Sequence, residues 1–188
     1  QGIIFDLDGV ICSTDEYHYQ AWKELADREG IPFDRSVNNR LRGVSRMESL
    51  EILLERAKRF YSQEEKEKMA AAKNTRYQEL LREMTPADLS PDVFETLETL
   101  RKQGLKLAIG SSSKNTPLIL DRLGLGGYFD AVSDGNNITR SKPAPEVFLK
   151  AAEYLGLSPE TCLVVEDAVS GVEAAHRAGM KAAALGDA

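Results

Sequence analysis

The chain has 188 residues, of which 42% are hydrophobic and 29% charged, and its formal net charge is −6. This length suffices for one compact domain or for a core with a small insertion. The negative charge disfavours nucleic acid as a partner, and no apolar run approaches the roughly 20 residues of a membrane-spanning helix. We therefore expect neither a nucleic-acid nor a membrane partner, and nothing in the sequence requires more than a monomer.

The two cysteines, Cys12 and Cys162, are too few for a disulfide framework and lack the spacing of metal ligands. Buried cysteines that act as small hydrophobic side chains fit this pattern better than ligands or nucleophiles. We therefore expect a reducing, cytoplasmic location.

The first apolar run predicts a buried strand at residues 2–5, GIIF. Ser13 and Glu16 have the spacing of a capping box, so a helix is expected to start there and to end at Gly30. The following residues, 34–83, carry helical periodicity and no strand-like alternation. They predict an inserted, all-helical domain.

From residue 85 onward, short apolar runs alternate with amphipathic stretches. The runs LKLAIG, YFDAVSD, TCLVV and KAAAL predict strands, and the stretches between them predict helices, the last with Ser170 as its N-cap. Such alternation indicates βαβ units. The predicted fold is therefore α/β, a Rossmann-like parallel sheet core of residues 1–13 and 85–188 flanked by helices, with an inserted all-helical cap domain, residues 14–84.

Polar side chains follow each of the buried strands. Because ligands bind at the carboxyl ends of parallel strands, these side chains are expected to meet at one edge of the sheet. They are Asp6 and Asp8 after the first strand, Ser111, Ser112, Ser113, Lys114 and Asn115 after the second, Lys142 in the loop after the third, and Glu166 and Asp167 after the fourth.

The chemistry of this edge suggests a cation and a phosphate. Two carboxylates as close as Asp6 and Asp8 repel each other unless positive charge lies near them, and carboxylate oxygens suit Mg²⁺. Together with Lys142, the metal would supply that charge. The hydroxyls and amides of residues 111–115 suit a phosphate. One aspartate can accept a phosphoryl group while its neighbour handles the proton, so the pair need not share one role.

The motifs DLDGV, the Ser-Ser turn, SKPAP and VVEDA, in this order and each after a strand, resemble the four motifs of the haloacid dehalogenase superfamily of phosphotransferases. The resemblance implies that Asp6 is the nucleophile and Asp8 the general acid/base. It implies that Ser111 and Lys142 bind the phosphoryl group. Mg²⁺ would be held by Asp6, the backbone carbonyl of Asp8, Asp167 and Glu166.

Within that superfamily, TDEYHYQAWKELA, RGVSRMESL, AAKN, SSSKN and SKPAPEVF resemble the β-phosphoglucomutases. This resemblance implies a phosphosugar substrate, with β-glucose 1-phosphate converted to glucose 6-phosphate through β-glucose 1,6-bisphosphate. It implies that Thr14 and His18 couple cap closure to the acid/base, with Lys73 as a partner. Trp22 packs in the cap on the simplest interpretation and lies near the sugar by the resemblance.

A bisphosphate that binds in either direction needs a second phosphate site on the cap. Gly43, Val44, Ser45 and Arg46 offer backbone N–H groups and one guanidinium, a good bidentate partner for a phosphate. Arg42 stands where lysine is frequent in the resembled family. On the residues alone, a solvated residue at a helix start is the preferred interpretation of Arg46, and a satisfied histidine on a helix face that of His18. The resemblance reverses the preference for Arg46 and favours a functional role for His18.

Two other functions remain open on the sequence. A sugar-phosphate phosphatase shares all the core motifs and differs only in admitting water to the aspartyl phosphate. A phosphosugar sensor on the same fold would need no acid/base, so the presence of both Asp6 and Asp8 favours an enzyme.

Overall fold

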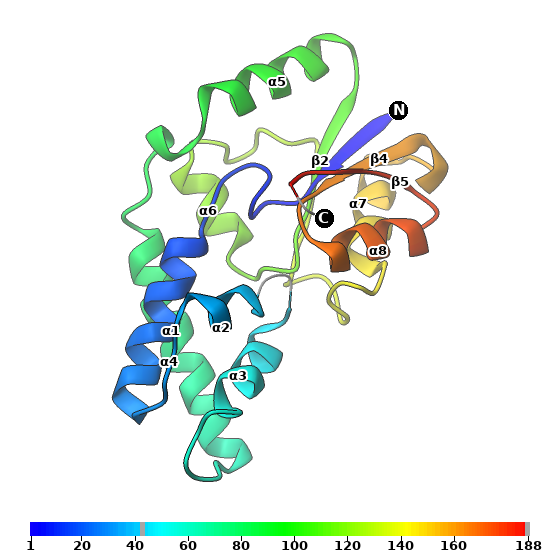
Figure 1. Ribbon diagram of the computed structural model, residues 1–188. Helices are drawn as coiled ribbons and strands as arrows, with labels where there is room; N and C mark the ends of the chain where they lie inside the picture. Colours follow the sequence, from blue (N-terminus) through cyan, green and yellow to red (C-terminus); the bar gives the residue numbers. More distant parts are fainter. Residues whose placement is uncertain (42–43, 187–188) are drawn as a thin grey trace. The chain divides into compact units, whose positions relative to one another are not determined.

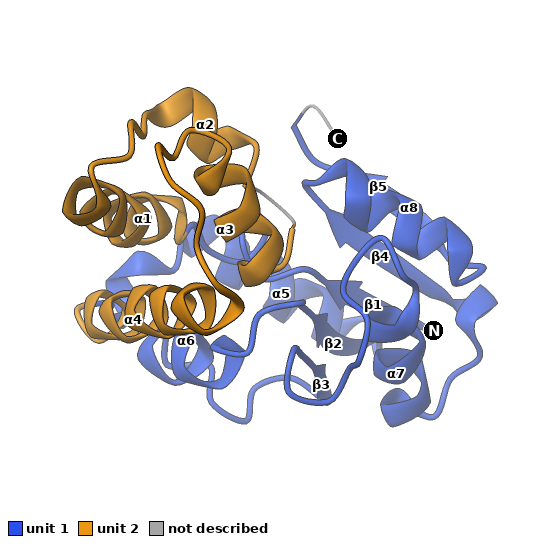
Figure 2. Cartoon of the chain, turned by 90° about the horizontal axis from the view of Figure 1, so that it is seen from below, with its two compact units in different colours: residues 1–13, 84–188 blue, residues 14–83 orange. Residues whose placement is uncertain are grey.

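The structure is a computed structural model that describes residues 1–41 and 44–186. Figure 1 shows the strands and helices in chain order and Figure 2 shows two compact units. Unit 1 comprises Gln1–Ser13 and Met84–Ala188, and unit 2 comprises Thr14–Glu83. The predicted Arg42 and Gly43 lie outside the described residues.

Unit 1 contains a five-stranded parallel sheet in the order β3-β2-β1-β4-β5. The strands are β1 Gly2–Phe5, β2 Lys106–Gly110, β3 Ala131–Ser133, β4 Cys162–Glu166 and β5 Lys181–Ala184. The helices of this unit are α5 Pro91–Lys102, α6 Thr116–Arg122, α7 Glu146–Leu155 and α8 Val169–Arg177, with short 3-10 turns at Pro86–Asp88 and Pro159–Thr161. The predicted parallel α/β core is confirmed.

One face of the sheet packs against α7 and α8. Ile4 in β1 is level with Ala108 in β2 and Val164 in β4, and all three are fully buried. Phe148 from α7 and Ala174 from α8 belong to the same buried cluster. β1 is the central strand of the sheet and all four of its residues are buried, which is why its sequence is a continuous apolar run.

Unit 2 contains helices joined by loops, with no strand among its described residues. Its helices are α1 Asp15–Glu29, α2 Arg35–Asn39, α3 Arg46–Leu54 and α4 Gln63–Leu81. Their apolar side chains form one core cluster, to which Trp22 and Leu25 of α1, Leu50 of α3 and Met69 of α4 contribute. No described helix in either unit combines the length and apolarity that crossing a membrane requires.

Two predicted caps are wrong. Helix α1 begins at Asp15 with Thr14, not Ser13, as its N-cap, so Glu16 stands one position too early to complete a capping box with Thr14. Its carboxylate instead accepts a hydrogen bond from Arg35. Helix α8 begins at Val169 after the N-cap Ala168, which places Ser170 inside the helix.

Candidate active site

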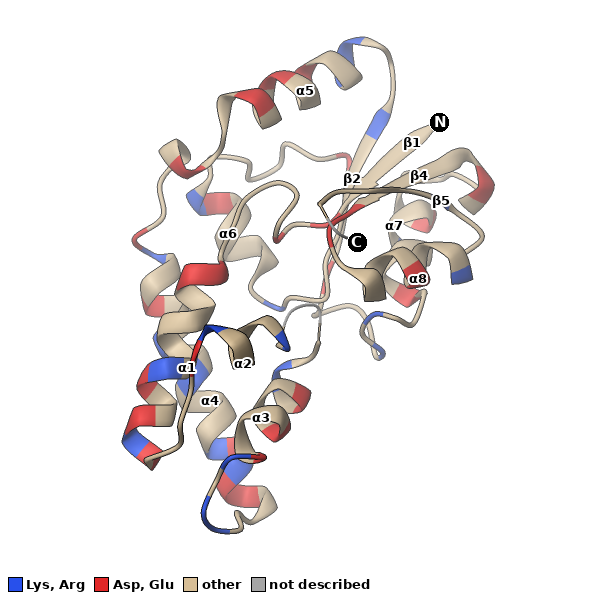
Figure 3. Cartoon of the chain, in the orientation of Figure 1, with Lys and Arg blue, Asp and Glu red and all other residues tan. Residues whose placement is uncertain are grey.

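The centre of the candidate site is a buried ion pair network in unit 1. Lys142 Nζ lies 2.5 Å from Asp6 Oδ1 and 2.8 Å from Glu166 Oε2. All three residues are buried, with exposed fractions of 7% for Lys142, 7% for Asp6 and 1% for Glu166. The loop after β3 therefore supplies a cation to carboxylates at the ends of β1 and β4, where acidic positions gather in Figure 3.

The sheet explains why these side chains meet. Phe5 of β1 pairs with Val165 of β4, and the Asp6 N–H continues the ladder by donating to the Val165 carbonyl at 2.9 Å. Asp6 and Glu166 thus leave two adjacent strands at the same level. Oxygens of Asp6, Glu166 and Asp167 lie within 4.8 Å of one another, the arrangement of a cluster that can hold a metal ion.

Charge and burial shift the ionisation of this network. Burial, followed by the charge of Asp6, raises the pKa of Glu166 to about 7, and Lys142 opposes the shift. Burial works to lower the pKa of Lys142, but the two carboxylates outweigh it and the net shift is upward. The network therefore keeps Lys142 cationic and favours an additional positive charge beside the three acids.

The turn after β1 brings Asp8 close to the sheet. Leu7 is fully buried, and its carbonyl accepts hydrogen bonds from the N–H groups of Ile11 and Cys12. Gly9 has a φ of +87°, a left-handed conformation that favours glycine. Asp8 is half-buried and forms an isolated bridge with Cys12. This tight turn therefore holds the backbone of Asp8 in place just after the strand that leads to Asp6.

The turn at residues 111–115 differs from the predicted phosphate cradle in one respect. The Ser111 hydroxyl accepts from the Ser113 N–H, and the Ser113 hydroxyl accepts from the Asn115 N–H. Two amides of the turn are thus occupied by the turn's own hydroxyls. Lys142 N–H donates to the Ser112 hydroxyl at 3.4 Å, which joins this turn to the lysine loop. Lys114 is exposed.

In unit 2, four of the predicted residues form one cluster. Lys73 Nζ lies 2.8 Å from Nδ1 of His18 and above the rings of Trp22 and Tyr77, at 4.9 Å and 4.4 Å from their centroids. Tyr77 donates a hydrogen bond from its hydroxyl to Thr14 Oγ1 at 2.9 Å and stacks on His18 with 4.0 Å between centroids. The sequence analysis missed Tyr77, which lies on one helical face with Lys73 at a spacing of four residues.

The cluster fixes the protonation of His18. Burial, then the charges of Lys73 and Arg46, lower the pKa of His18 well below its usual range. The imidazole is therefore neutral at physiological pH. Because an ammonium only donates, Nδ1 accepts the hydrogen bond from Lys73 and the ring proton resides on Nε2. His18 is thus a donor at its second nitrogen.

The predicted distal phosphate site lies at the start of α3. Ser45 is the N-cap of this helix and shares a capping box with Glu48, in which its hydroxyl and its N–H are both engaged. Burial lowers the pKa of the half-buried Arg46 guanidinium, opposed only by Tyr77 among the described residues. The positive charge of Arg46 is therefore partly desolvated, and a bound anion would compensate it. The hydroxyl and N–H of Ser45, in contrast, are used to cap the helix.

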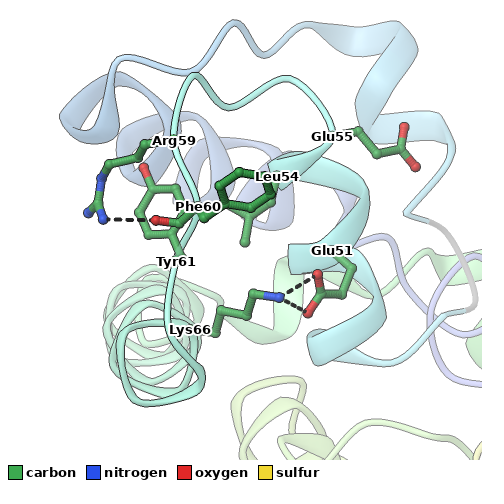
Figure 4. A pocket seen from close by; sticks show the side chains of 7 residues that line it. All are labelled: Glu51, Leu54, Glu55, Arg59, Phe60, Tyr61 and Lys66. Carbon is green, nitrogen blue, oxygen red and sulfur yellow. Dashed lines mark hydrogen bonds and ion pairs between the residues drawn. The ribbon is translucent and has the colours of Figure 1, made fainter.

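The surface depressions on unit 2 differ in their chemistry from the acidic cluster of unit 1. One depression of about 350 Å³ lies beside the loop between α3 and α4 and is walled in part by Leu54 and Tyr61 (Figure 4). Its charged groups are largely matched, since Lys66 Nζ lies 2.8 Å from Oε1 of Glu51. The acidic cluster of unit 1 is the stronger candidate for catalysis.

Comparison with known proteins supports this assignment. A family model described as haloacid dehalogenase-like hydrolase matches residues 1–179. The β-phosphoglucomutase of Bacillus subtilis is 44% identical over 188 residues, which cover 99% of this chain and 83% of that protein. The phosphorylated carbohydrates phosphatase of Thermotoga maritima is 35% identical over 184 residues, which cover 96% of this chain and 82% of that protein.

A solved structure agrees with both. The crystal structure of β-phosphoglucomutase from Clostridium difficile matches with a TM-score of 0.91 and 40% identity, covering 99% of this chain and 84% of that chain. The superfamily resemblance that the four motifs predicted is confirmed. The family model matches nearly the whole chain, and the four motifs lie at one edge of a parallel sheet. The chain therefore belongs to the haloacid dehalogenase-like hydrolases.

Proposed function

We propose that the chain interconverts β-D-glucose 1-phosphate and glucose 6-phosphate through an aspartyl-phosphate enzyme and β-glucose 1,6-bisphosphate. The similarity to two enzymes named β-phosphoglucomutase, at 44% and 40% identity over 99% of the chain, supports this reaction. The observation that carries the chemistry is Lys142 between Asp6 and Glu166, with Asp167 beside them.

Asp6 is the nucleophile in this proposal. One carboxylate oxygen attacks phosphorus and forms the aspartyl O–P bond, while the P–O bond to the sugar breaks and its electrons go to the sugar oxygen. Lys142 holds Asp6 in place and neutralises charge on the phosphoryl oxygens. Burial of Asp6 keeps bulk water away from the reacting carboxylate.

Asp8 is the general acid/base. In the first half-reaction it gives its proton to the departing sugar oxygen, and in the second it removes the proton of the sugar hydroxyl that attacks the aspartyl phosphate. Its placement two residues after Asp6, on the turn closed by Leu7 and Gly9, suits a group that meets the same phosphoryl group from the other side.

The acidic cluster fits a hard divalent cation, because three carboxylates offer oxygens within 4.8 Å of one another. We assign Mg²⁺ to Asp6, the carbonyl of Asp8, Glu166 and Asp167. When bound, the ion would neutralise developing charge on the transferring phosphoryl group. Ser111, with the neighbouring Ser112, Ser113, Lys114 and Asn115, would hold that group's remaining oxygens.

Unit 2 supplies the second phosphate site and the cap in this proposal. Arg46 is the anchor for the phosphate that is not transferred, since its guanidinium is desolvated. Val44 and Ser45 come directly before Arg46 in this segment, and the predicted Arg42 and Gly43 lie outside the described residues. Thr14, His18 and Lys73 act together: Tyr77 donates a hydrogen bond to Thr14 and stacks on His18, which accepts a hydrogen bond from Lys73. The ammonium of Lys73 also lies over the ring of Trp22.

Product analysis tests the proposed reaction. The purified protein is incubated with Mg²⁺, β-glucose 1-phosphate and a trace of β-glucose 1,6-bisphosphate, and glucose 6-phosphate and free phosphate are measured together. Glucose 6-phosphate with little free phosphate is the expected result. Free phosphate as the main product would overturn the mutase assignment in favour of a phosphatase, the activity in the name of the Thermotoga maritima relative.

Two further expectations accompany the proposal. Cys12 and Cys162 are both free and buried, as expected for a protein of a reducing compartment such as the cytoplasm. A monomer remains the predicted oligomeric state, which sedimentation analysis would test.

A further inference from the structure

Two glycines lie directly against carboxylates of the acidic cluster. A Cβ atom built on Gly171 would come within 2.0 Å of Glu166 Cδ and 2.3 Å of its Oε2. A Cβ atom on Gly9 would come within 2.0 Å of Asp167 Oδ2. Neither separation is physically possible, so any larger residue at these positions would displace the carboxylate or the backbone.

Gly171 is the more informative of the two. It is the third residue of α8 and has no positive φ, so its backbone conformation does not call for glycine. Glycine inside a helix is less stable than alanine at the same place. Gly9, in contrast, has a φ of +87°, so the turn itself already favours glycine there. At Gly171 the close approach of Glu166 is the feature that explains the residue.

The position that Gly171 permits is specific for Glu166. The Glu166 carboxylate accepts the Ala168 N–H at Oε1, over 3.2 Å, and the Lys142 ammonium at Oε2, over 2.8 Å. Both of its oxygens are thus oriented, and the residue is only 1% exposed. A methyl group added at Gly171 would therefore push the Glu166 carboxylate away from its two partners. The sheet would stay in place, because the carboxylate is the end of a side chain and moves more easily than the backbone.

We propose that Gly171 is a positioning residue: by lacking a side chain it lets the Glu166 carboxylate lie in the first turn of α8, at the place where it can hold the cation. Gly9 likewise leaves space for the Asp167 carboxylate. The inference rests on the proposed Mg²⁺ site and adds the residues that set its geometry. Groups that orient metal ligands affect metal affinity by about 10- to 100-fold when they are changed.

The test is Mg²⁺ binding to the full chain by isothermal titration calorimetry, with circular dichroism as the check of folding. Gly171→Ala is expected to weaken Mg²⁺ binding by at least about 10-fold, while the spectrum and cooperative unfolding are retained. Its matched control is Ser170→Ala, one residue earlier in the same helical turn, which should bind Mg²⁺ as the natural protein does. In turnover, the Mg²⁺ concentration for half-maximal rate should rise more than the rate at saturating Mg²⁺ falls.

A double substitution keeps the inference testable if Gly171→Ala folds poorly. Aspartate is shorter than glutamate by one methylene group, so Glu166→Asp withdraws the carboxylate from the added methyl. Gly171→Ala should then cost little further Mg²⁺ affinity in the Glu166→Asp background. Equal Mg²⁺ affinity of Gly171→Ala and the natural protein, or full additivity in the double variant, would overturn the positioning role. Absence of Mg²⁺ binding by the natural protein would instead overturn the metal assignment itself.

Discussion

The Lys142 ammonium donates a hydrogen bond to Asp6 Oδ1 over 2.5 Å, and the two side chains are only 4% and 10% exposed. A buried carboxylate that loses its cation retains an uncompensated charge, which destabilises a protein more than the loss of an exposed pair does. The stability of unit 1 and its chemistry therefore depend on the same lysine.

Replacing this lysine by methionine should lower the free energy of unfolding by about 3–5 kcal/mol, because Asp6 and Glu166 would face each other unpaired. Turnover of the phosphosugar should be lost as well. Urea unfolding in metal-free buffer measures the first effect. The control is Lys102→Met at the exposed end of α5, for which a change within about 0.5 kcal/mol is expected. Equal effects of the two substitutions would contradict the role of the buried pair.

The roles of Asp6 and Asp8 can be distinguished by the choice of phosphoryl donor. Asp6→Asn removes the nucleophilic oxygen and should give no phosphoenzyme with any donor, as measured by intact-protein mass spectrometry. Asp8→Asn should still become phosphorylated by acetyl phosphate, whose leaving group needs no proton, but should not turn over β-glucose 1-phosphate. A normal yield of phosphoenzyme from Asp6→Asn would disprove the assignment of the nucleophile.

The fold was predictable from sequence because the central strands of a parallel sheet are largely buried. GIIF is a continuous apolar run because all four of its residues are buried, and in CLVV buried residues alternate with half-buried ones. The polar residues that follow these two runs meet at one edge by the geometry of the sheet. The network of Asp6, Lys142 and Glu166 was therefore predicted as a group, although its distances were not.

The errors and omissions concern contacts that the chain makes only once it is folded. Ser13 looked like a helix cap from local spacing, but Thr14 takes that position and is bound by Tyr77, 63 residues away. Tyr77 itself lies in a helix dense in charge, where one aromatic residue carries no distinct signal. Gly171 escaped attention because a glycine in a helix is informative only when the atoms beside it are known.

Arg46 offers a test of the second phosphate site. Arg46→Ala should lower kcat/KM for the phosphosugar by about 10- to 100-fold, the value of one or two charge-assisted hydrogen bonds, and leave hydrolysis of p-nitrophenyl phosphate nearly unchanged. The matched control is Arg40→Ala, since Arg40 is exposed and forms a bidentate pair with Glu55. Equal losses with both substrates would mean that Arg46 does not anchor a distal phosphate.

The lowered pKa of His18 predicts how the free energy of unfolding depends on pH. Its pKa is lowered well below the usual range by burial first and then by Lys73 and Arg46, so the folded protein disfavours the imidazolium. The unfolded chain binds the proton with a pKa near about 6.5. The contribution of neutral His18 is therefore complete above that pH and is lost as the pH falls below it, toward the lowered pKa of the folded state.

The expected slope is about 1.4 kcal/mol for each pH unit below about pH 6.5, the value for one proton. Urea unfolding of the natural protein and of His18→Gln between pH 8 and pH 5, chosen to span about 1.5 units on either side of that pKa, measures it as the difference between the two curves. The curves should run parallel above the unfolded pKa and converge below it. His176→Gln, which removes an exposed histidine of α8, serves as the control. A constant difference across the whole range would show that His18 gains a proton as readily in the folded protein as in the unfolded chain.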